Sequence, residues 1–267
     1  MTSAPDVSSI SVAVDEGVAT VTLERPDVRN VISDAPLVDE LPLVCEWLNR
    51  TPDVRAAVLT GRGTAFSAGG NVRLMHERAG MFGGAPEEIA QAYRHGIQRL
   101  IRAVVAIEVP VVAAVNGPAI GAGFDLALAC DLRLASTSAK FGETFVNLGL
   151  IPGDGGSWLL PPVVGWHRAA ELAFTGRIVD AEEAARIGIV LSVHDEADLL
   201  AAAHDVAATI AAKPAMAMRY TKRLLTRARA GVPFDQVLDE AAVLQGTLHG
   251  TTAHHDAVRA MLDRRRT

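Results

Sequence analysis

The stretch NGPAIGAGFDLALACD, residues 116–131, decides the fold that the sequence predicts. It continues an uninterrupted β-branched run, 109–117, bounded by proline and glycine, which is typical of a strand covered on both faces. Small residues at 121–123 then precede Asp125 and an apolar run through Cys130, which predicts a helix. The first N–H groups of a helix lack partners inside it, and the helix dipole favours negative charge there. We therefore expect a strand–turn–helix unit whose bare turn can approach a ligand.

A second glycine turn, FSAGGN at 66–71, follows the strand-like run 54–61. Glycines and alanines let a ligand come close to the backbone. One N–H from each turn can together hold a carbonyl oxygen while it becomes an oxyanion. The residues alone also fit tight turns and close packing without a ligand. Neither turn carries the Gly-Lys-Ser/Thr of a phosphate-binding loop, and the dinucleotide pattern is not matched.

Composition indicates a compact protein rather than a disordered one. Of 267 residues, 49% are hydrophobic and 21% are charged, which suits a folded domain. The net charge of −6 argues against binding to nucleic acid or to anionic membranes. Cys45 and Cys130 lie far apart without metal-ligand spacing, so we expect two buried thiols in a reducing compartment. We found no secretory signal and no apolar run of about 20 residues, and expect a cytoplasmic location.

Periodicity and turn signals predict one α/β core, residues 1–195, followed by a C-terminal helical region, residues 196–267. The N-terminal runs 10–14 and 19–23 alternate around Asp-Glu-Gly and predict a hairpin. We expect a helix over 33–49, capped by Ser33 or Asp34 and limited by Pro36 and Pro42. Further predicted elements are a helix over 87–106, a strand over 132–136, a glycine- and proline-rich loop over 140–165, and helices from 166 onward, one of them with Asp180 and Glu183 at capping-box spacing.

Five ordered blocks give a more specific expectation. They are ERPDVRNVIS (24–33), VLTGRGTAFSAGGNV (58–72), PVVAAVNGPAIGAGFDLALACDLRLAS (110–136), FGETFVNLGLIPGDGGSWLLPPVVG (141–165) and ELAFTGRIVDAEEAARIGIV (171–190). In order and spacing the chain resembles the enoyl-CoA hydratase/isomerase (crotonase) superfamily. The resemblance implies a spiral of ββα turns, homotrimers or hexamers, and a C-terminal helical region, residues 196–267, that serves oligomerisation. It also implies an acyl-CoA thioester substrate, a role in fatty acid metabolism, and no metal or redox cofactor, since coenzyme A is part of the substrate.

The resemblance also assigns expected roles to residues. The N–H groups of Gly70 and Ala122 match the two donors to the thioester oxygen. The backbone around Arg25–Val31 and Ala68–Gly70 matches the segments that hold coenzyme A. Further expected substrate contacts are Gly69, Gly121 and Phe145, with the side chains of Arg29 and Lys222 as phosphate contacts.

The expected acids depart from the pattern of the family's hydratases, which place two glutamates beside the double bond. The first glutamate matches Asp125, but Phe145 occupies the position of the second. Glu143 and Asp154 are therefore candidates for the missing base. Each acid also has a simpler interpretation: Asp125 as a helix cap or dipole partner, Asp154 as a turn residue, and Glu143 as a hydrogen-bonding loop acid.

The function expected from the resemblance is hydration of a 2-enoyl-CoA through an enolate held in a backbone oxyanion hole. Loss of the second glutamate keeps double-bond isomerisation as an alternative. A non-catalytic binding protein with the crotonase fold is the third possibility.

Overall fold

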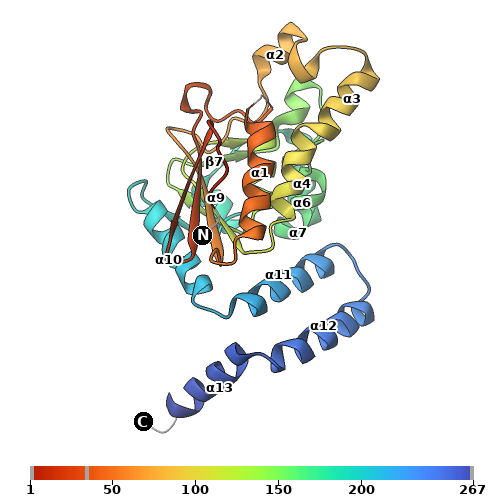
Figure 1. Cartoon of the computed structure of the whole chain (residues 1–267). Coiled ribbons are helices and arrows are strands. Elements are labelled where there is room, and N and C mark those ends of the chain that lie inside the picture. The colour runs from red at the N-terminus through yellow and green to blue at the C-terminus, as the bar shows by residue number, and fades with distance from the viewer. Residues whose placement is uncertain (1–2, 34–35, 265–267) are drawn as a thin grey trace.

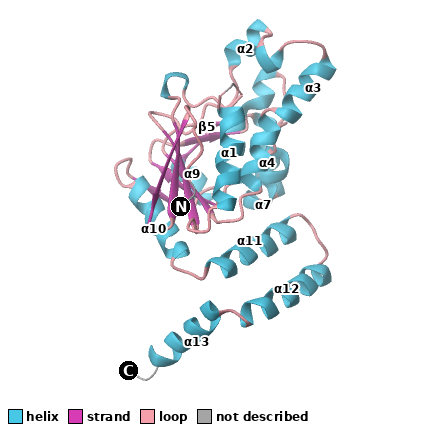
Figure 2. Cartoon of the chain, in the orientation of Figure 1, coloured by secondary structure: helices cyan, strands magenta, loops and turns pink. Residues whose placement is uncertain are grey.

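The structure, a computed structural model, describes residues 3–33 and 36–264. Figure 1 shows an α/β body from which the last helices of the chain extend away. Figure 2 shows the strands gathered inside this body, with helices around them. The fold that positions the site consists of two sheets and the helices that cover them.

A six-stranded sheet forms the centre of the body, in the order β1-β2-β3-β4-β6-β9. The first two strands form an antiparallel hairpin in which Asp15 faces Val18, and the remaining neighbours are parallel. Glu16 and Gly17 both have positive φ, 46° and 85°, as tight two-residue hairpin turns require. The predicted hairpin is confirmed. The strands are β1 (Ile10–Asp15), β2 (Val18–Leu23), β3 (Ala56–Gly61), β4 (Val111–Val115), β6 (Leu132–Ser136) and β9 (Ser192–His194).

Strand β4 is buried along its whole length, as its continuous apolar run predicted. Its residues alternate between two hydrophobic clusters. Ala113 and Val115 belong to the cluster packed around the helices that precede and follow β4. Val112 and Ala114 face the other cluster, where they meet helix α10 (Leu199–Ala211). Because both faces are covered, no face of β4 carries polar side chains.

A small second sheet joins the two glycine turns. It has the order β5-β7-β8, with β5 (Ala119–Ile120) parallel to β7 (Lys140–Gly142) and β8 (Val179–Asp180) antiparallel to β7. Ser67, in the first glycine turn, forms an isolated parallel bridge with Ala119. Strands β5, β7, β8 and β9, each two or three residues long, were not predicted, and β7 lies where a loop was expected.

Helix α1 (Leu37–Arg50) begins later than expected and is not limited by Pro42, which lies inside it. Asp34, one of the two expected caps, lies outside the described residues, and the helix begins after Pro36 rather than at Ser33. A proline inside a helix leaves the carbonyl four residues earlier without its helical donor. Here the guanidinium of Arg99 donates to that carbonyl, Val38 O, at 3.1 Å. The neighbouring helix thus satisfies the group that Pro42 leaves open.

The helix predicted over 87–106 is two helices, α3 (Pro86–His95) and α4 (Ile97–Val105). The break falls at Gly96, whose φ and ψ are −97° and −110°. A Cβ at this position would lie 2.6 Å from the carbonyl oxygen of Ala92. The glycine therefore allows a turn that a side chain would obstruct, and it separates a peripheral helix from one with a buried face.

Helix α5 and the helices from residue 166 onward were predicted, whereas α2 was not and α6 and α7 lie in the segment predicted as a loop. Asp180 accepts a hydrogen bond from the N–H of Glu183 at 2.8 Å and so caps α9 as expected. The helices are α2 (Val72–Glu77), α5 (Ala122–Ala129), α6 (Gly156–Leu159), α7 (Pro161–Val164), α8 (Trp166–Thr175), α9 (Ala181–Arg186), α11 (Ala215–Arg229), α12 (Phe234–His249) and α13 (Thr252–Arg264), with short 3₁₀ turns at Pro26–Val28, Gly80–Phe82 and Thr144–Leu148.

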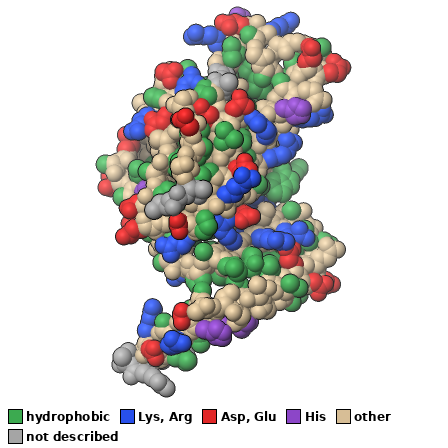
Figure 3. Space-filling model, in the orientation of Figure 1, with side chains coloured by type: hydrophobic (Ala, Val, Ile, Leu, Met, Phe, Trp, Pro, Cys, Tyr) green, Lys and Arg blue, Asp and Glu red, His purple; other side chains and the backbone are tan. Residues whose placement is uncertain are grey.

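The C-terminal helices leave the body only after α10. Ala203 and Ala207 of α10 pack on the sheet, so the layer that covers it extends beyond residue 195. By contrast α12 and α13 bury none of their residues, and Figure 3 shows apolar side chains on their surface. These exposed side chains are Phe234, Leu238, Val243, Val258, Met261 and Leu262. Among the described residues, no helix is long and apolar enough to cross a membrane.

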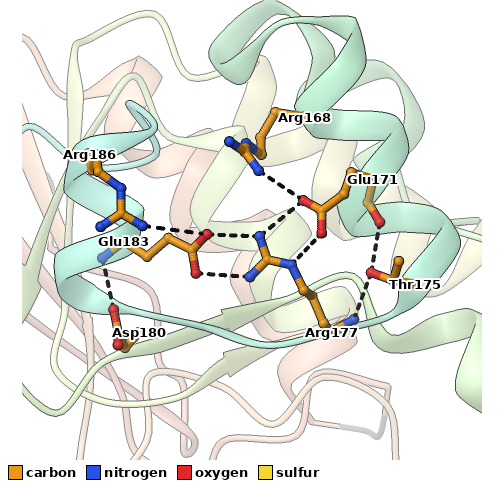
Figure 4. Close-up of polar contacts among 7 residues, drawn as sticks. All are labelled: Arg168, Glu171, Thr175, Arg177, Asp180, Glu183 and Arg186. Carbon is orange, nitrogen blue, oxygen red and sulfur yellow. Dashed lines mark hydrogen bonds and ion pairs between the residues drawn. The ribbon is translucent and has the colours of Figure 1, made fainter.

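An ion-pair network fastens the segment before β8 (Figure 4). The Arg177 guanidinium donates to both carboxylate oxygens of Glu171 and to both of Glu183, from 2.8 to 3.0 Å for three of these bonds. The carbonyl of Arg177 lies 3.5 Å from the point where a Cβ on Gly142 would stand. The network thus holds residues 176–180 against β7, directly before Glu143.

We expect Arg177→Met to lower the free energy of unfolding by about 1 kcal/mol at low salt, because two carboxylates lose a bidentate partner. The loss should shrink in 1 M NaCl, where exposed charges are screened. Urea unfolding at both salt concentrations measures it. Arg50→Met, which removes one exposed pair with Glu46, is the matched control. An equal effect of the two substitutions would show that the network is no more than a surface pair.

Candidate active site

The two glycine turns meet at the end of the main sheet. Beyond the Ser67–Ala119 bridge, the N–H of Ser67 donates to Pro118 O and the N–H of Ile120 donates to Ser67 O, both at 3.1 Å. A Cβ on Gly69 would lie 3.1 Å from the backbone N of Ala122. Gly70 and Ala122 both line one cavity. The structure therefore brings together the two expected donor residues from segments about fifty residues apart in the chain.

The peptide between Gly69 and Gly70 is held in one orientation. The N–H of Ile32 donates to Gly69 O at 2.9 Å. In a planar trans peptide the C=O and the following N–H point in opposite directions. The Gly70 N–H therefore points away from Ile32. Gly69 has φ 78°, and a Cβ there would lie 2.3 Å from Ile120 O, so the position requires glycine.

The peptide between Gly121 and Ala122 is fixed by the start of α5. Gly121 O accepts the N–H of Phe124 at 2.8 Å and the N–H of Asp125 at 3.0 Å, so the Ala122 N–H points outward from the helix. Gly121 has φ 53° and ψ −123°, and its N–H donates to Gly142 O at 2.8 Å. Within the described residues, no hydrogen bond uses the N–H of Gly70 or of Ala122. Two oriented donors are thus available at the cavity.

The three candidate carboxyl groups lie close together near these donors. Asp125 lies on the first turn of α5, Glu143 follows β7, and Asp154 precedes α6. Their exposed fractions are 0%, 1% and 5%. A Cβ on Gly156 would lie 2.3 Å from Asp125 Oδ1 and 2.3 Å from Glu143 Oε1, so both oxygens abut the same glycine. Asp154 lines the cavity that Gly70 and Ala122 line, and the structure therefore unites all three candidate acids.

Burial dominates the protonation of these acids. It raises the pKa of Asp125 well above its usual range, and the charge of Glu143 raises it further. Burial also raises the pKa of Glu143 to about 7. Burial and the charge of Asp125 raise the pKa of Asp154 to about 7. Among the described residues, the oxygens of Asp125 and Glu143 and Oδ1 of Asp154 have no hydrogen-bond partner, although the nearby backbone N–H of Gly156 acts to lower the pKa of Asp125 against the larger effect of burial. A proton held between Asp125 and Glu143 gives both groups a partner, as in other buried carboxyl pairs.

The raised pKa values predict how stability depends on pH. Between about pH 4 and pH 7 the folded state holds protons that the unfolded state releases, so stability falls as pH rises through this window. Asp154→Asn removes one such group. We expect its free energy of unfolding, relative to the wild type, to improve by about 2–4 kcal/mol between pH 5 and pH 8.

Urea unfolding at the two pH values measures this change. Asp205→Asn, at an exposed position of α10, is the control and should show no comparable change. An Asp154→Asn profile parallel to that of the wild type would mean that Asp154 is not protonated by burial.

The cavity that holds Gly70, Ala122 and Asp154 is otherwise mostly apolar. The ring of Phe145 lies 3.6 Å from the point where a Cβ on Gly121 would stand. Burial and the nearby charge of Asp154 raise the pKa of Tyr93. Phe145 forms part of the cavity wall, and an aromatic ring rather than a carboxylate occupies that position. The other apolar lining residues include Met75, Met81, Phe82, Ile97, Leu148 and Leu150.

The residues expected to contact coenzyme A differ in how exposed they are. Arg29 is exposed and Arg25 is half-buried, with an ion pair to Asp27 at 3.5 Å. Val31 is buried, and the N–H of Ala68 donates to Arg29 O at 2.9 Å, so these segments lie side by side next to the cavity. Both segments border the first donor.

The expectation for Lys222 is corrected. Its ammonium donates to Asp131 Oδ2 at 2.6 Å and to Val109 O at 2.9 Å, and 9% of the side chain is exposed. Asp131 and Val109 flank the end of β4 opposite to the glycine turn. A buried ammonium paired with a carboxylate is a structural group here and not a phosphate contact of this site.

Sequence reasoning missed the supporting roles of Gly156, Ser67 and Asn30. The Gly-Asp-Gly-Gly run at 153–156 was a signal for close backbone approach. Nothing in the local pattern marked Ser67 or Asn30. No group of three or more His, Cys, Asp or Glu side chains suited to a metal ion occurs within the described residues.

Comparisons with known proteins agree with this geometry. The family described as enoyl-CoA hydratase/isomerase matches residues 13–266. The short-chain-enoyl-CoA hydratase of Clostridium acetobutylicum is 31% identical and covers 98% of this chain and 97% of its own. The 1,2-epoxyphenylacetyl-CoA isomerase of Escherichia coli is 34% identical, covering 94% of both chains. The crystal structure of an enoyl-CoA hydratase from Bacillus anthracis superposes with a TM-score of 0.89, at 32% identity over 96% of this chain and 97% of that chain.

Proposed function

Because the chain belongs to the enoyl-CoA hydratase/isomerase family, we propose that it hydrates a 2-enoyl-CoA thioester held at the Gly70 and Ala122 donors. The chain has the crotonase fold, and it is an enzyme rather than a non-catalytic binding protein, as its relatives are. The observation that carries the proposal is the pair of oriented N–H groups without partners in the described part of the chain. Such donors stabilise negative charge that develops on a thioester oxygen during attack at the β-carbon.

The three carboxyls supply the proton transfers. Hydration needs a base that takes a proton from water as its oxygen bonds to C3, and an acid that delivers a proton to C2. Asp154 borders the cavity, and its pKa of about 7 suits the base. Asp125, whose pKa lies well above its usual range, keeps its proton and suits the acid, with Glu143 as its partner. Enzymes assign acid and base roles to neighbouring carboxyls by placing them in environments that give them different pKa values.

Isomerisation of a 3-enoyl-CoA is the second candidate, favoured by Phe145. An aromatic wall where hydratases of the family place their second glutamate leaves less polar surface to hold a water. A shift of the double bond needs no water, since one carboxyl can move a proton between C4 and C2 over the same enolate. One relative is itself named an isomerase.

Two substrates distinguish the reactions. Crotonyl-CoA loses its conjugated-thioester absorbance on hydration, whereas a 3-enoyl-CoA gains that absorbance on isomerisation. We expect the first signal to dominate. A dominant second signal would assign the isomerase activity, and silence with both substrates would overturn both assignments.

We further propose a cytoplasmic homotrimer or hexamer that acts in fatty acid metabolism without a metal or redox cofactor. The exposed apolar side chains of α12 and α13 support assembly, because surfaces of this kind commonly mark protein contacts. Light scattering of the purified protein gives the mass in solution, and a monomer at micromolar concentration would contradict the proposal. Dialysis against a chelator should leave turnover unchanged, and a loss restored by a divalent cation would contradict the cofactor proposal.

A further inference from the structure

The hydroxyl of Ser67 lies at the junction of the segments that carry the two donors. Ser67 is 0% exposed. Its Oγ donates to Asn30 O at 2.8 Å and accepts the N–H of Gly69 at 3.1 Å. Its backbone meanwhile bonds to Pro118 and Ile120, directly before the second donor. One residue thus fixes the first glycine turn through its side chain and the second through its main chain.

These bonds close a ring around Gly69. On one side the Ser67 hydroxyl holds the Gly69 N–H. On the other side the Ile32 N–H holds the Gly69 carbonyl. Asn30, two residues before Ile32, accepts the Ser67 hydroxyl proton. Both peptide planes of Gly69 are therefore fixed, and the second plane contains the Gly70 N–H.

Asn30 is itself rigidly held. Its backbone is left-handed, with φ 53°, a conformation that asparagine tolerates better than most residues. Its side-chain amide donates to Arg62 O and Ala65 O at 3.0 and 2.9 Å, and its Oδ1 accepts the N–H of Arg25 at 2.9 Å. The carbonyl that receives the Ser67 hydroxyl therefore has little freedom to move.

We propose that Ser67 is a positioning residue that sets the direction of the Gly70 N–H and thereby the polarisation of a bound thioester carbonyl. A glycine held at only one of its two peptide planes can rotate about φ and ψ. Without the hydroxyl, the Gly69 N–H loses its partner, and the Ile32 bond to Gly69 O is, within the described residues, the one remaining hydrogen bond at the two Gly69 peptide planes, so the direction of the Gly70 N–H is set less tightly. The inference rests on the proposed function, because it assumes that this N–H binds the thioester oxygen.

The test is Ser67→Ala with a conjugated aryl-acryloyl-CoA as spectroscopic probe. Its absorbance shifts to longer wavelength when the carbonyl is polarised. We expect Ser67→Ala to bind the probe within about threefold of the wild-type Kd, to reduce the red shift, and to lower kcat for enoyl-CoA by about 10-fold, less than the 10²–10³ for complete loss of a donor. Ser136→Ala is the matched control, since Ser136 is also 0% exposed but its hydroxyl contacts Ser138.

The outcomes separate the two proposals. A wild type with neither red shift nor turnover would overturn the proposed function. A wild-type red shift that persists in Ser67→Ala, with kcat within twofold, would overturn the role of Ser67 alone. If Ser67→Ala does not fold, Ser67→Cys fills the space with a weaker hydrogen-bonding group, and its red shift should still fall below that of the wild type. A Ser67→Cys shift equal to the wild-type shift would also overturn the inference.

Discussion

Asp125→Asn is expected to lower kcat by about 10²–10⁴ while acyl-CoA binding changes by no more than a few-fold. Asparagine preserves the shape of the side chain but cannot supply or accept the transferred proton. Because Asp125 is fully buried and its pKa is raised well above the usual range, a neutral amide there should not destabilise the fold at neutral pH. The loss should therefore appear in turnover and not in the melting temperature.

Steady-state kinetics and calorimetric titration with a slowly reacting acyl-CoA measure these quantities. Asp205→Asn, at an exposed position of α10, is the matched control. Unchanged turnover in Asp125→Asn would return this residue to the simpler role of complementing the dipole of α5.

Gly156→Ala is expected to reduce turnover by about 10²-fold and to lower the free energy of unfolding by about 1–3 kcal/mol. The added Cβ would stand 2.3 Å from one oxygen of Asp125 and 2.3 Å from one oxygen of Glu143, which no real Cβ tolerates. One or both buried carboxyls must therefore move away from their positions beside Gly156. Alanine otherwise stabilises helices relative to glycine. A lower free energy of unfolding in Gly156→Ala would therefore come from the contact of the added Cβ with the two carboxyls.

Gly246→Ala provides the matched control in α12, because nothing lies within 4 Å of its added Cβ. It should stabilise the protein slightly and leave turnover unchanged. A Gly156→Ala enzyme with wild-type turnover would show that the positions of the Asp125 and Glu143 carboxyls do not matter for the reaction.

The predictable parts of the fold and the site are those encoded by local pattern. The β1–β2 hairpin follows from alternation around a turn that needs positive φ. Strand β4 follows from its continuous apolar run. The local pattern marked the two turns of small residues that follow strands, where a backbone can approach a ligand closely, whereas the choice of Gly70 and Ala122 within them came from the family resemblance.

The remaining features depend on contacts between distant segments. Pro42 stays inside a helix because Arg99 donates to the carbonyl it leaves open. Lys222 was expected from the resemblance to contact a phosphate, yet tertiary packing pairs it with Asp131. Likewise, Asp125 and Glu143 become a pair only because Gly156 lets both approach the same point. None of these partners is visible in the residues that flank Pro42, Lys222 or Asp125.

The position of α10 has a consequence for the protein during its synthesis. The sheet face formed by Val58, Val112 and Ala114 has its cover in α10, which ends at Ala211. A nascent chain leaves the ribosome N-terminus first, so this apolar face emerges well before the helix that shields it. Uncovered apolar surface on partly folded chains promotes aggregation. Between translation of β6 and of α10, this face therefore lacks the helix that covers it in the folded protein.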